Sequence, residues 1–220
     1  GISLIQSYGL TEASALAATM HGEDAIKHSV WAGRPIVGSE MKIGDADGNA
    51  LANGEVGEIM VRGPHVMREY WRNPEATAAT FAGDWLRTGD TGMMNDEGFV
   101  KVVDRSKDMI ISGGINVYPA EIEKILSANP HIAELAVIGV PDSDWGEVPM
   151  IVASGVRDQA AAMSTFECDG SAQLAPFKRP RRVVFIDEPL PRTLSGKVSK
   201  PTLRGLFPAV PEQAKALFGK

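Results

Sequence analysis

The amino-acid sequence predicts an α+β protein in which a β-rich, barrel-like part precedes a small α+β domain. Short strand-like segments separated by turn residues dominate residues 34–103. Beyond residue 108, strand-like segments alternate with helical patterns. The charged run from Asp104 to Lys107 separates the two patterns. We therefore expect one domain over residues 1–104, a hinge at 105–107 and a second domain over 108–220.

The β-rich part begins with two strands joined by turn-forming residues. The predicted elements of this part are strands at Glu40 to Ile43, Glu58 to Arg62 and Phe99 to Val103, with turns at Asp45 to Gly48 and Asn53-Gly54. Asn73 followed by Pro74 and Glu75 has an N-cap, a proline at the first helical position and an acidic first turn, which together predict a short helix. A compact barrel or sandwich is the expected result.

The second part starts with a short strand closed by two glycines. The predicted elements here are strands at Met109 to Ser112, Glu134 to Val140, Val148 to Gly155 and Arg182 to Asp187, with helical segments from Pro119, at Pro201 to Phe207 and at Pro211 to Phe218. In the first helix Ile122, Ile125 and Leu126 fall on one face. Residues 157–175 are Ala-rich and polar, and their pattern assigns them to no element.

The composition excludes several classes of protein. With 44% hydrophobic and 23% charged residues, the chain is neither disordered nor membrane-embedded, and no apolar run approaches the roughly 20 residues of a membrane span. A net charge of −6 argues against general nucleic-acid binding. Cys168 is the single cysteine, so we expect a reducing, cytoplasmic location and an inert packing role. The four histidines are too scattered in sequence for a metal-ligand pattern.

Four motifs carry the strongest functional signal. They are Tyr8-Gly9-Leu10-Thr11-Glu12, Thr88-Gly89-Asp90, the run from Asp104 to Glu123, and Pro191-Arg192-Thr193-Leu194-Ser195-Gly196-Lys197-Val198. In this order and at about this spacing, they resemble the adenylate-forming, AMP-binding acyl-CoA synthetases, most closely the fatty acid and arylpropenoic acid:CoA ligases. The resemblance implies that residues 1–104 are the end of a large AMP-binding domain and that 108–220 are its mobile C-terminal domain.

The first motif gathers a ring, a hydroxyl and a carboxylate within five residues. The resemblance implies that Tyr8 packs on adenine, that Thr11 contacts the α-phosphate and that Glu12 binds Mg²⁺. Gly9 permits a tight bend close to a ligand. Oxygen ligands suit a hard dication that neutralises phosphate charge. Taken alone, the motif is also compatible with a simple strand-to-turn junction.

The second and third motifs extend the implied nucleotide site. The resemblance implies that Asp90 accepts hydrogen bonds from the ribose hydroxyls, that Arg105 contacts the nucleotide and that Lys107 is the hinge residue. A charged, solvated residue suits a hinge, because its backbone can turn without exposing a core. Alone, Thr-Gly-Asp is a common turn. The run from Asp104 to Lys107 is by itself more typical of a solvated linker, and the linker and hinge roles are compatible with each other.

The remaining candidates concern coenzyme A and the phosphoryl group. Gly113 and Gly114 predict a tight hairpin turn, and the resemblance implies that this turn lines the tunnel for the pantetheine arm. Lys197 is implied to be catalytic, bridging the substrate carboxylate and the α-phosphate. Trp145, Phe177 and Arg179 resemble residues that hold the CoA nucleotide in some relatives. Trp145 is equally compatible with a core or interface aromatic residue.

The function implied by this resemblance is that of an ATP-dependent carboxylic acid:CoA ligase. Its substrates and cofactors would be a small carboxylic acid, ATP, which yields AMP, Mg²⁺ and coenzyme A. The chain has no Met at its start and no Gly-rich phosphate loop, so we expect a fragment that is inactive without the N-terminal portion of its own chain. Two alternatives stay open, namely an adenylation module that loads a carrier protein and a non-catalytic binding module.

Overall fold

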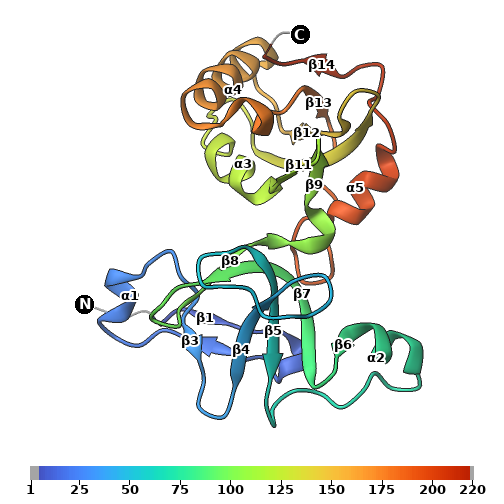
Figure 1. Cartoon of the computed structure of the whole chain (residues 1–220). Coiled ribbons are helices and arrows are strands. Elements are labelled where there is room, and N and C mark those ends of the chain that lie inside the picture. Colours follow the sequence, from blue (N-terminus) through green and yellow to red (C-terminus); the bar gives the residue numbers. More distant parts are fainter. Residues whose placement is uncertain (1–4, 219–220) are drawn as a thin grey trace. The chain divides into compact units, whose positions relative to one another are not determined.

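The computed structural model describes residues 5–218 and divides the chain into two compact units, Gly1–Lys107 and Asp108–Lys220 (Figure 1). The division falls within a 3-10 helix, η2 (Ser106–Asp108). Among the described residues, each unit has hydrophobic core residues of its own, in one cluster in the first unit and in two clusters in the second. In the part of the chain that the structure describes, no helix is both long and apolar enough to cross a membrane.

The first unit consists of two antiparallel sheets and short helices. One sheet has the order β1 (Ser7–Tyr8), β2 (Ala18–Thr19), β3 (Arg34–Pro35). The other has the order β4 (Glu40–Gly44), β5 (Gly57–Arg62), β7 (Trp85–Met94), β6 (Phe81–Ala82), and β8 (Val100–Arg105) also pairs with β7. The helices are η1 (Thr11–Ala13), α1 (Asp24–Lys27) and α2 (Pro74–Thr80). The larger sheet is curled, as expected for the β-rich part (Figure 1).

Local sequence explains these elements well. In β4 the buried Met41 and Ile43 alternate with Glu40 and Lys42, the period of a strand with one buried face. The side chain of Asn73 caps α2 by accepting a 3.0 Å hydrogen bond from the amide of Ala76. The strands expected around residues 40–43, 58–62 and 99–103 are all present.

The second unit is a six-stranded mixed sheet with helices on both faces. Its strands run in the order β10 (Ile115–Val117), β9 (Ile110–Ser112), β12 (Gly146–Ser154), β13 (Arg182–Ile186), β14 (Lys215–Ala216), and β11 (Glu134–Asp142) also pairs with β12. The helices are α3 (Pro119–Leu126), α4 (Gln159–Gln173), η3 (Pro176–Lys178) and α5 (Lys200–Leu206).

The two faces of this sheet belong to two separate cores. Val137 of β11 packs in one core with Ile122 of α3 and Phe166 of α4. Its neighbour Ile138 packs in the other core, with Leu203 of α5. Because successive side chains of a strand point to opposite faces, a strand buried on both sides reads as a continuous apolar run. This explains why β11 and β12 were recognisable from sequence.

Three expectations about the second unit need correction or completion. The segment from Pro211 to Phe218 is not helical, since β14 within it pairs with β13 instead. Most of the unassigned residues 157–175 form the long helix α4 (Gln159–Gln173), which Asp158 caps by accepting a hydrogen bond from the amide of Ala161. Cys168 lies on α4 but is exposed, so the expected packing role is wrong.

Candidate functional site

Tyr8, Asp90 and Arg105 form a cluster in the first unit. The hydroxyl of Tyr8 donates a 2.7 Å hydrogen bond to Oδ2 of Asp90, and the other carboxylate oxygen, Oδ1, lies 3.4 Å from Nε of Arg105. The Asp90 side chain is 14% exposed and the Arg105 side chain 70% exposed, so the carboxylate is sheltered while the guanidinium faces solvent. Three residues from three separate predicted motifs therefore meet at one place.

The backbone of the first unit brings these residues together. Asp90 lies on β7 directly opposite Arg105 on β8 in the antiparallel register. Tyr8 ends β1 and is followed by Gly9, where an added Cβ would lie 2.1 Å from the carbonyl oxygen of Ala15. Only glycine fits such a close approach of two backbone segments. At Gly9 the structure thus shows a close approach of two backbone segments, and the bend expected there stays a prediction.

The phenol of Tyr8 is strongly perturbed. Burial, together with the charge of the Asp90 carboxylate and the hydrogen bond to it, raises the pKa of Tyr8 far above its usual value. Both effects oppose formation of a phenolate, the first by removing water and the second by repulsion. Tyr8 therefore remains a neutral hydrogen-bond donor that keeps the carboxylate of Asp90 in place.

Thr11 and Glu12 lie on η1, which follows Gly9 after one intervening residue, Leu10. Thr11 is exposed, and Glu12 accepts a 2.9 Å hydrogen bond at Oε1 from the hydroxyl of Tyr70. Burial and this contact raise the pKa of Tyr70. Sequence reasoning missed Tyr70, which is 58 residues from Glu12 and belongs to none of the four motifs. The backbone carbonyl of Glu12 also accepts a 2.7 Å bond from the amide of Met67.

The paired glycines of the second unit form the expected hairpin turn. Gly113 and Gly114 connect β9 to β10 with φ values of +58° and +80°, a conformation that favours glycine. A Cβ at Gly113 would lie 2.6 Å from Cε3 of Trp145, whereas one at Gly114 would meet nothing within 4 Å. The indole of Trp145 therefore lies against the backbone of the turn, while Gly114 has open space beside it.

Trp145 is held by two further contacts. Its carbonyl accepts a 2.8 Å hydrogen bond from the amide of Gly113, and the guanidinium of Arg181 lies 4.7 Å from the centre of its ring. The side chain remains 39% exposed, so the indole is a surface feature and not a core residue. No role was assigned to Arg181 from the sequence. The structure places it beside Trp145.

Phe177 and Arg179 are on and just after η3. Phe177 is 37% exposed. Arg179 donates from Nε to the carbonyl of Leu174 and from Nη2 to the carbonyl of Ser171, both at 3.1 Å. Two of the guanidinium donors thus bind carbonyl groups at the end of α4, which leaves fewer donors for a ligand.

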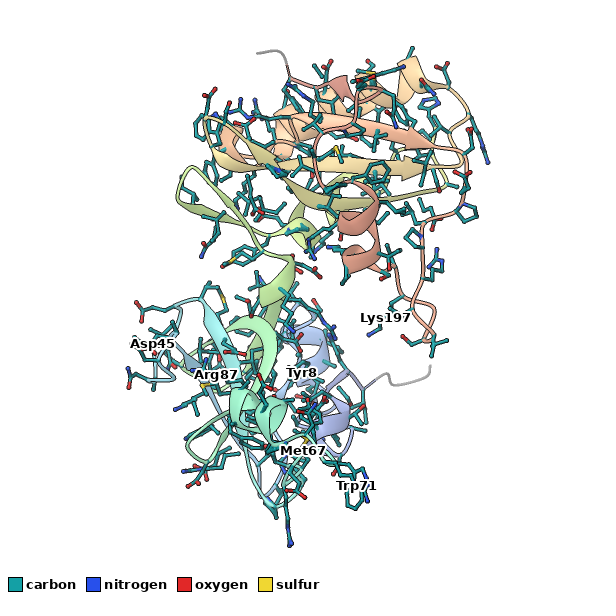
Figure 2. All side chains as sticks on the ribbon, turned by 90° about the vertical axis from the view of Figure 1, so that its right-hand side faces the viewer. Tyr8, Asp45, Met67, Trp71, Arg87 and Lys197 are labelled. Atoms are coloured by element: carbon teal, nitrogen blue, oxygen red, sulfur yellow. The ribbon has the colours of Figure 1, made fainter. Side chains whose placement is uncertain are left out.

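Lys197 lies in a loop of the second unit, between β13 and α5. Its side chain is exposed and projects away from the body of that unit (Figure 2). The loop closes on itself, because the amide of Thr193 donates to the carbonyl of Lys197 at 2.8 Å and the amide of Gly196 donates to the carbonyl of Thr193 at 2.9 Å. Gly196 has a φ of +82° in this turn.

The Lys197 loop and the glycine turn connect to opposite ends of β12. Ser112, which precedes the glycine turn, pairs with Gly146 at the start of β12. Ser154 at the other end of β12 pairs with Glu134, whose side chain contacts the Lys197 loop. A strand of this length spans about 27 Å at the usual rise per residue. The second unit therefore carries two separate candidate surfaces.

Lys107 is exposed and lies on η2, at the end of the first unit. Within residues 5–218 there is no group of three or more His, Cys, Asp or Glu residues that could hold a metal ion by itself. A Mg²⁺ ion near Glu12 would therefore need further oxygen ligands from phosphates and water, which is the usual situation for this ion.

Two family models match this chain. The model of AMP-binding enzymes matches residues 1–71, and the model of the AMP-binding enzyme C-terminal domain matches residues 121–197. A long-chain-fatty-acid–CoA ligase of Mycobacterium tuberculosis is 39% identical over 208 residues, covering 94% of this chain and 41% of the relative. Indoleacetate–CoA ligase of Aromatoleum aromaticum is 43% identical over 210 residues, covering 94% and 40%. The chain thus spans about two-fifths of these relatives.

A solved structure agrees with this likeness. The o-succinylbenzoate CoA synthetase of Bacillus subtilis, in complex with its acyl-adenylate intermediate, matches with a TM-score of 0.83 at 38% identity, over 91% of this chain and 40% of that chain. The same synthetase has been solved with ATP and a magnesium ion, and with AMP. The α+β fold expected from the sequence is the fold of this neighbour.

Proposed function

This chain belongs to the AMP-binding enzyme family, and from this premise we propose that it is the C-terminal portion of an ATP-dependent carboxylic acid:CoA ligase. In such an enzyme a carboxylate attacks the α-phosphorus of ATP, so that an acyl-adenylate forms and pyrophosphate leaves. The thiol of CoA then attacks the acyl carbonyl, loses its proton and displaces AMP. The observation that carries this proposal is the cluster of Tyr8, Asp90 and Arg105.

The cluster suits the sugar and base of a nucleotide. A carboxylate has about four acceptor positions, and Tyr8 and Arg105 use only part of the capacity of Asp90. Asp90 can therefore accept hydrogen bonds from both ribose hydroxyls while Tyr8 holds it in place. The ring of Tyr8 would offer its face to adenine, and the exposed Arg105 would add positive charge near the phosphates.

Glu12 suits a magnesium ion. Its carboxylate is half-buried and supplies the hard oxygen ligands that Mg²⁺ prefers. When bound, the ion would neutralise negative charge on the phosphates. Tyr70 would fix the orientation of the Glu12 carboxylate by the hydrogen bond to Oε1, and the hydroxyl of Thr11 would donate to the α-phosphate.

The second unit would serve the two reactions in turn. Lys197 would stabilise the negative charge that develops at the α-phosphate during adenylation. The turn at Gly113 and Gly114 would line the path of the pantetheine arm during thioester formation. The two surfaces connect to opposite ends of β12, which supports their use by one pocket in turn. We therefore propose that the second domain rotates about Lys107 between the two steps.

The CoA nucleotide would lie near Trp145. Its exposed indole offers a stacking surface, and Arg181 beside it offers charge for a phosphate. Phe177 would add a second aromatic surface. Arg179 would contribute less than the sequence suggested, because two of its donors are already used.

The remaining parts of the proposal concern the whole enzyme. A fatty acid or arylpropenoic acid is the proposed substrate, and catalysis is expected only when the chain is joined to an N-terminal portion that supplies the phosphate loop. The hinge region at 105–107, which separates domains at 1–104 and 108–220, belongs to the same proposal. So does a cytoplasmic location, expected from the single cysteine.

A panel of carboxylic acids tests this function. The complete enzyme is incubated with each acid and ATP, with and without CoA, and AMP release and pyrophosphate exchange are measured. We expect acid-dependent exchange without CoA, and AMP release that rises when CoA is added. Exchange without any response to CoA would favour loading of a carrier protein, and the absence of exchange with every acid would favour a non-catalytic module.

A further inference from the structure

Glu134, the first residue of β11, connects its strand to two other segments of the second unit, the end of β12 and residues 190–192. Its Oε1 accepts hydrogen bonds from the amide of Leu190 at 2.8 Å and from the hydroxyl of Ser154 at 3.2 Å. Its Oε2 pairs with Nη2 of Arg192. The side chain is 22% exposed, so this carboxylate is sheltered and makes charge-assisted contacts.

Arg192 carries this connection into the Lys197 loop. Its second terminal nitrogen, Nη1, donates a 2.9 Å hydrogen bond to the carbonyl of Gly196, the residue before Lys197. One planar guanidinium therefore joins the fixed end of β11 to the tip of the loop. A lysine could not reproduce this geometry with a single ammonium group.

The base of the loop is fixed as well. The amide of Ser199 donates a 2.7 Å hydrogen bond to the carbonyl of Pro191, and Arg192 pairs with Val198 as an isolated β-bridge. Beyond the base, Lys200 forms a 3.0 Å ion pair with Glu123 of α3. By contrast, the tip has no apolar anchor, since the side chain of Leu194 is fully exposed. The hydrogen bonds within the tip close the loop on itself, and the contact from Arg192 links the tip to Glu134 outside the loop.

We propose that Glu134 and Arg192 act as positioning residues that hold the Lys197 loop in one conformation. The significance for catalysis rests on the function proposed above for Lys197. A flexible loop would spread the ammonium group over many positions, and fixing it in advance lowers the entropy lost when it must meet a developing charge. Neither Glu134 nor Arg192 touches the substrate in this scheme.

Amide hydrogen exchange of this 220-residue chain tests the restraint without any catalytic assay. Arg192→Met keeps the aliphatic stem and removes both donors, and Glu134→Gln removes the charge. We expect the amides of Thr193 and Gly196 to exchange roughly tenfold faster in both variants, as for a segment that opens locally. Lys215→Met, which removes an exposed cation elsewhere in the same unit, should leave them unchanged.

The amides of β12 act as an internal control, because their slow exchange shows that the unit remains folded. Arg192 is half exposed, so its replacement leaves both cores intact even where Glu134→Gln does not. Unchanged exchange at Thr193 and Gly196 in a folded Arg192→Met variant would overturn the proposed restraint, whatever the function of Lys197.

A second measurement separates positioning from the proposed function. In the complete enzyme, Arg192→Met should lower pyrophosphate exchange by about tenfold and spare thioester formation from added acyl-adenylate. Arg192→Met could speed hydrogen exchange in the loop but leave pyrophosphate exchange unchanged, while Lys197→Ala lowers pyrophosphate exchange. In that case the positioning role is wrong and the function of Lys197 stands. If Lys197→Ala is also without effect, the proposed function fails, and hydrogen exchange alone decides the restraint.

Discussion

The hydroxyl of Tyr8 donates a 2.7 Å hydrogen bond to the carboxylate of Asp90, which lies 82 residues further along the chain. The contact joins the end of β1 to β7 and leaves the carboxylate partly open to other donors. It also links two motifs that the sequence analysis could connect only by resemblance. The first two predictions follow from this pair.

The first prediction is that Asp90→Asn weakens AMP binding by about tenfold or more, because the amide replaces a charged acceptor and leaves Tyr8 with a weaker partner. Asp96→Asn is the matched control, since Asp96 lies in the turn after β7 and contacts Asn53 instead. Calorimetric titration of the chain with AMP measures both variants. Equal affinities in the two variants would remove Asp90 from the nucleotide site.

The second prediction concerns alkaline pH. An ordinary tyrosine loses its proton near pH 10, and the raised pKa of Tyr8 means that the native protein keeps this proton when the unfolded chain has lost it. The free energy of unfolding should therefore fall as the pH rises above about 10, and less so in Tyr8→Phe. Absorbance at the phenolate band should show a late ionisation that Tyr8→Phe removes.

The third prediction compares the two glycines of the turn. Both have positive φ, so alanine at either position introduces backbone strain of about 1 kcal/mol. At Gly113 the new Cβ would also displace Trp145, whereas at Gly114 it would enter open space. Urea denaturation should therefore show a larger loss of stability for Gly113→Ala than for Gly114→Ala. Equal losses would mean that Trp145 does not pack against the turn.

Most of the fold was predictable because local signals agreed with the final packing. The cap at Asn73 and the apolar runs of β11 and β12 are examples. Helix α4 was missed because Phe166 is the one large side chain among its buried residues, so no apolar stripe marks the helix. The two-residue strand β14 was missed because its conformation is set by its partner β13 and not by its own residues.

The candidate site was predictable only in part. Motif residues such as Tyr8 and Asp90 could be named from sequence, and the structure brings them together. Tyr70 and Arg181 could not be found in this way, because their contacts with Glu12 and Trp145 arise from tertiary packing over long sequence separations. The roles that the resemblance implies for Tyr8 and Asp90 stay predictions.

The fourth prediction tests the hinge. Proline fixes φ near −65° and removes a backbone donor, so Lys107→Pro in the complete enzyme should hold the second domain in one orientation. We expect adenylation to continue and CoA transfer to fall. The thermal transition must first match that of the parent within a few degrees, which excludes unfolding. Parental rates for both steps in the folded variant would place the pivot elsewhere.

The most direct test of the whole account is to measure the two half-reactions of the complete enzyme separately, in Lys197→Ala and in Gly114→Leu. Lys197→Ala should slow pyrophosphate exchange by about a hundredfold or more and spare thioester formation from added acyl-adenylate. Gly114→Leu should slow thioester formation and spare pyrophosphate exchange. Gly114→Ala, which has the same backbone strain without the bulk, should slow thioester formation only slightly. Equal losses in both half-reactions for both variants would contradict the division of labour proposed for the second domain.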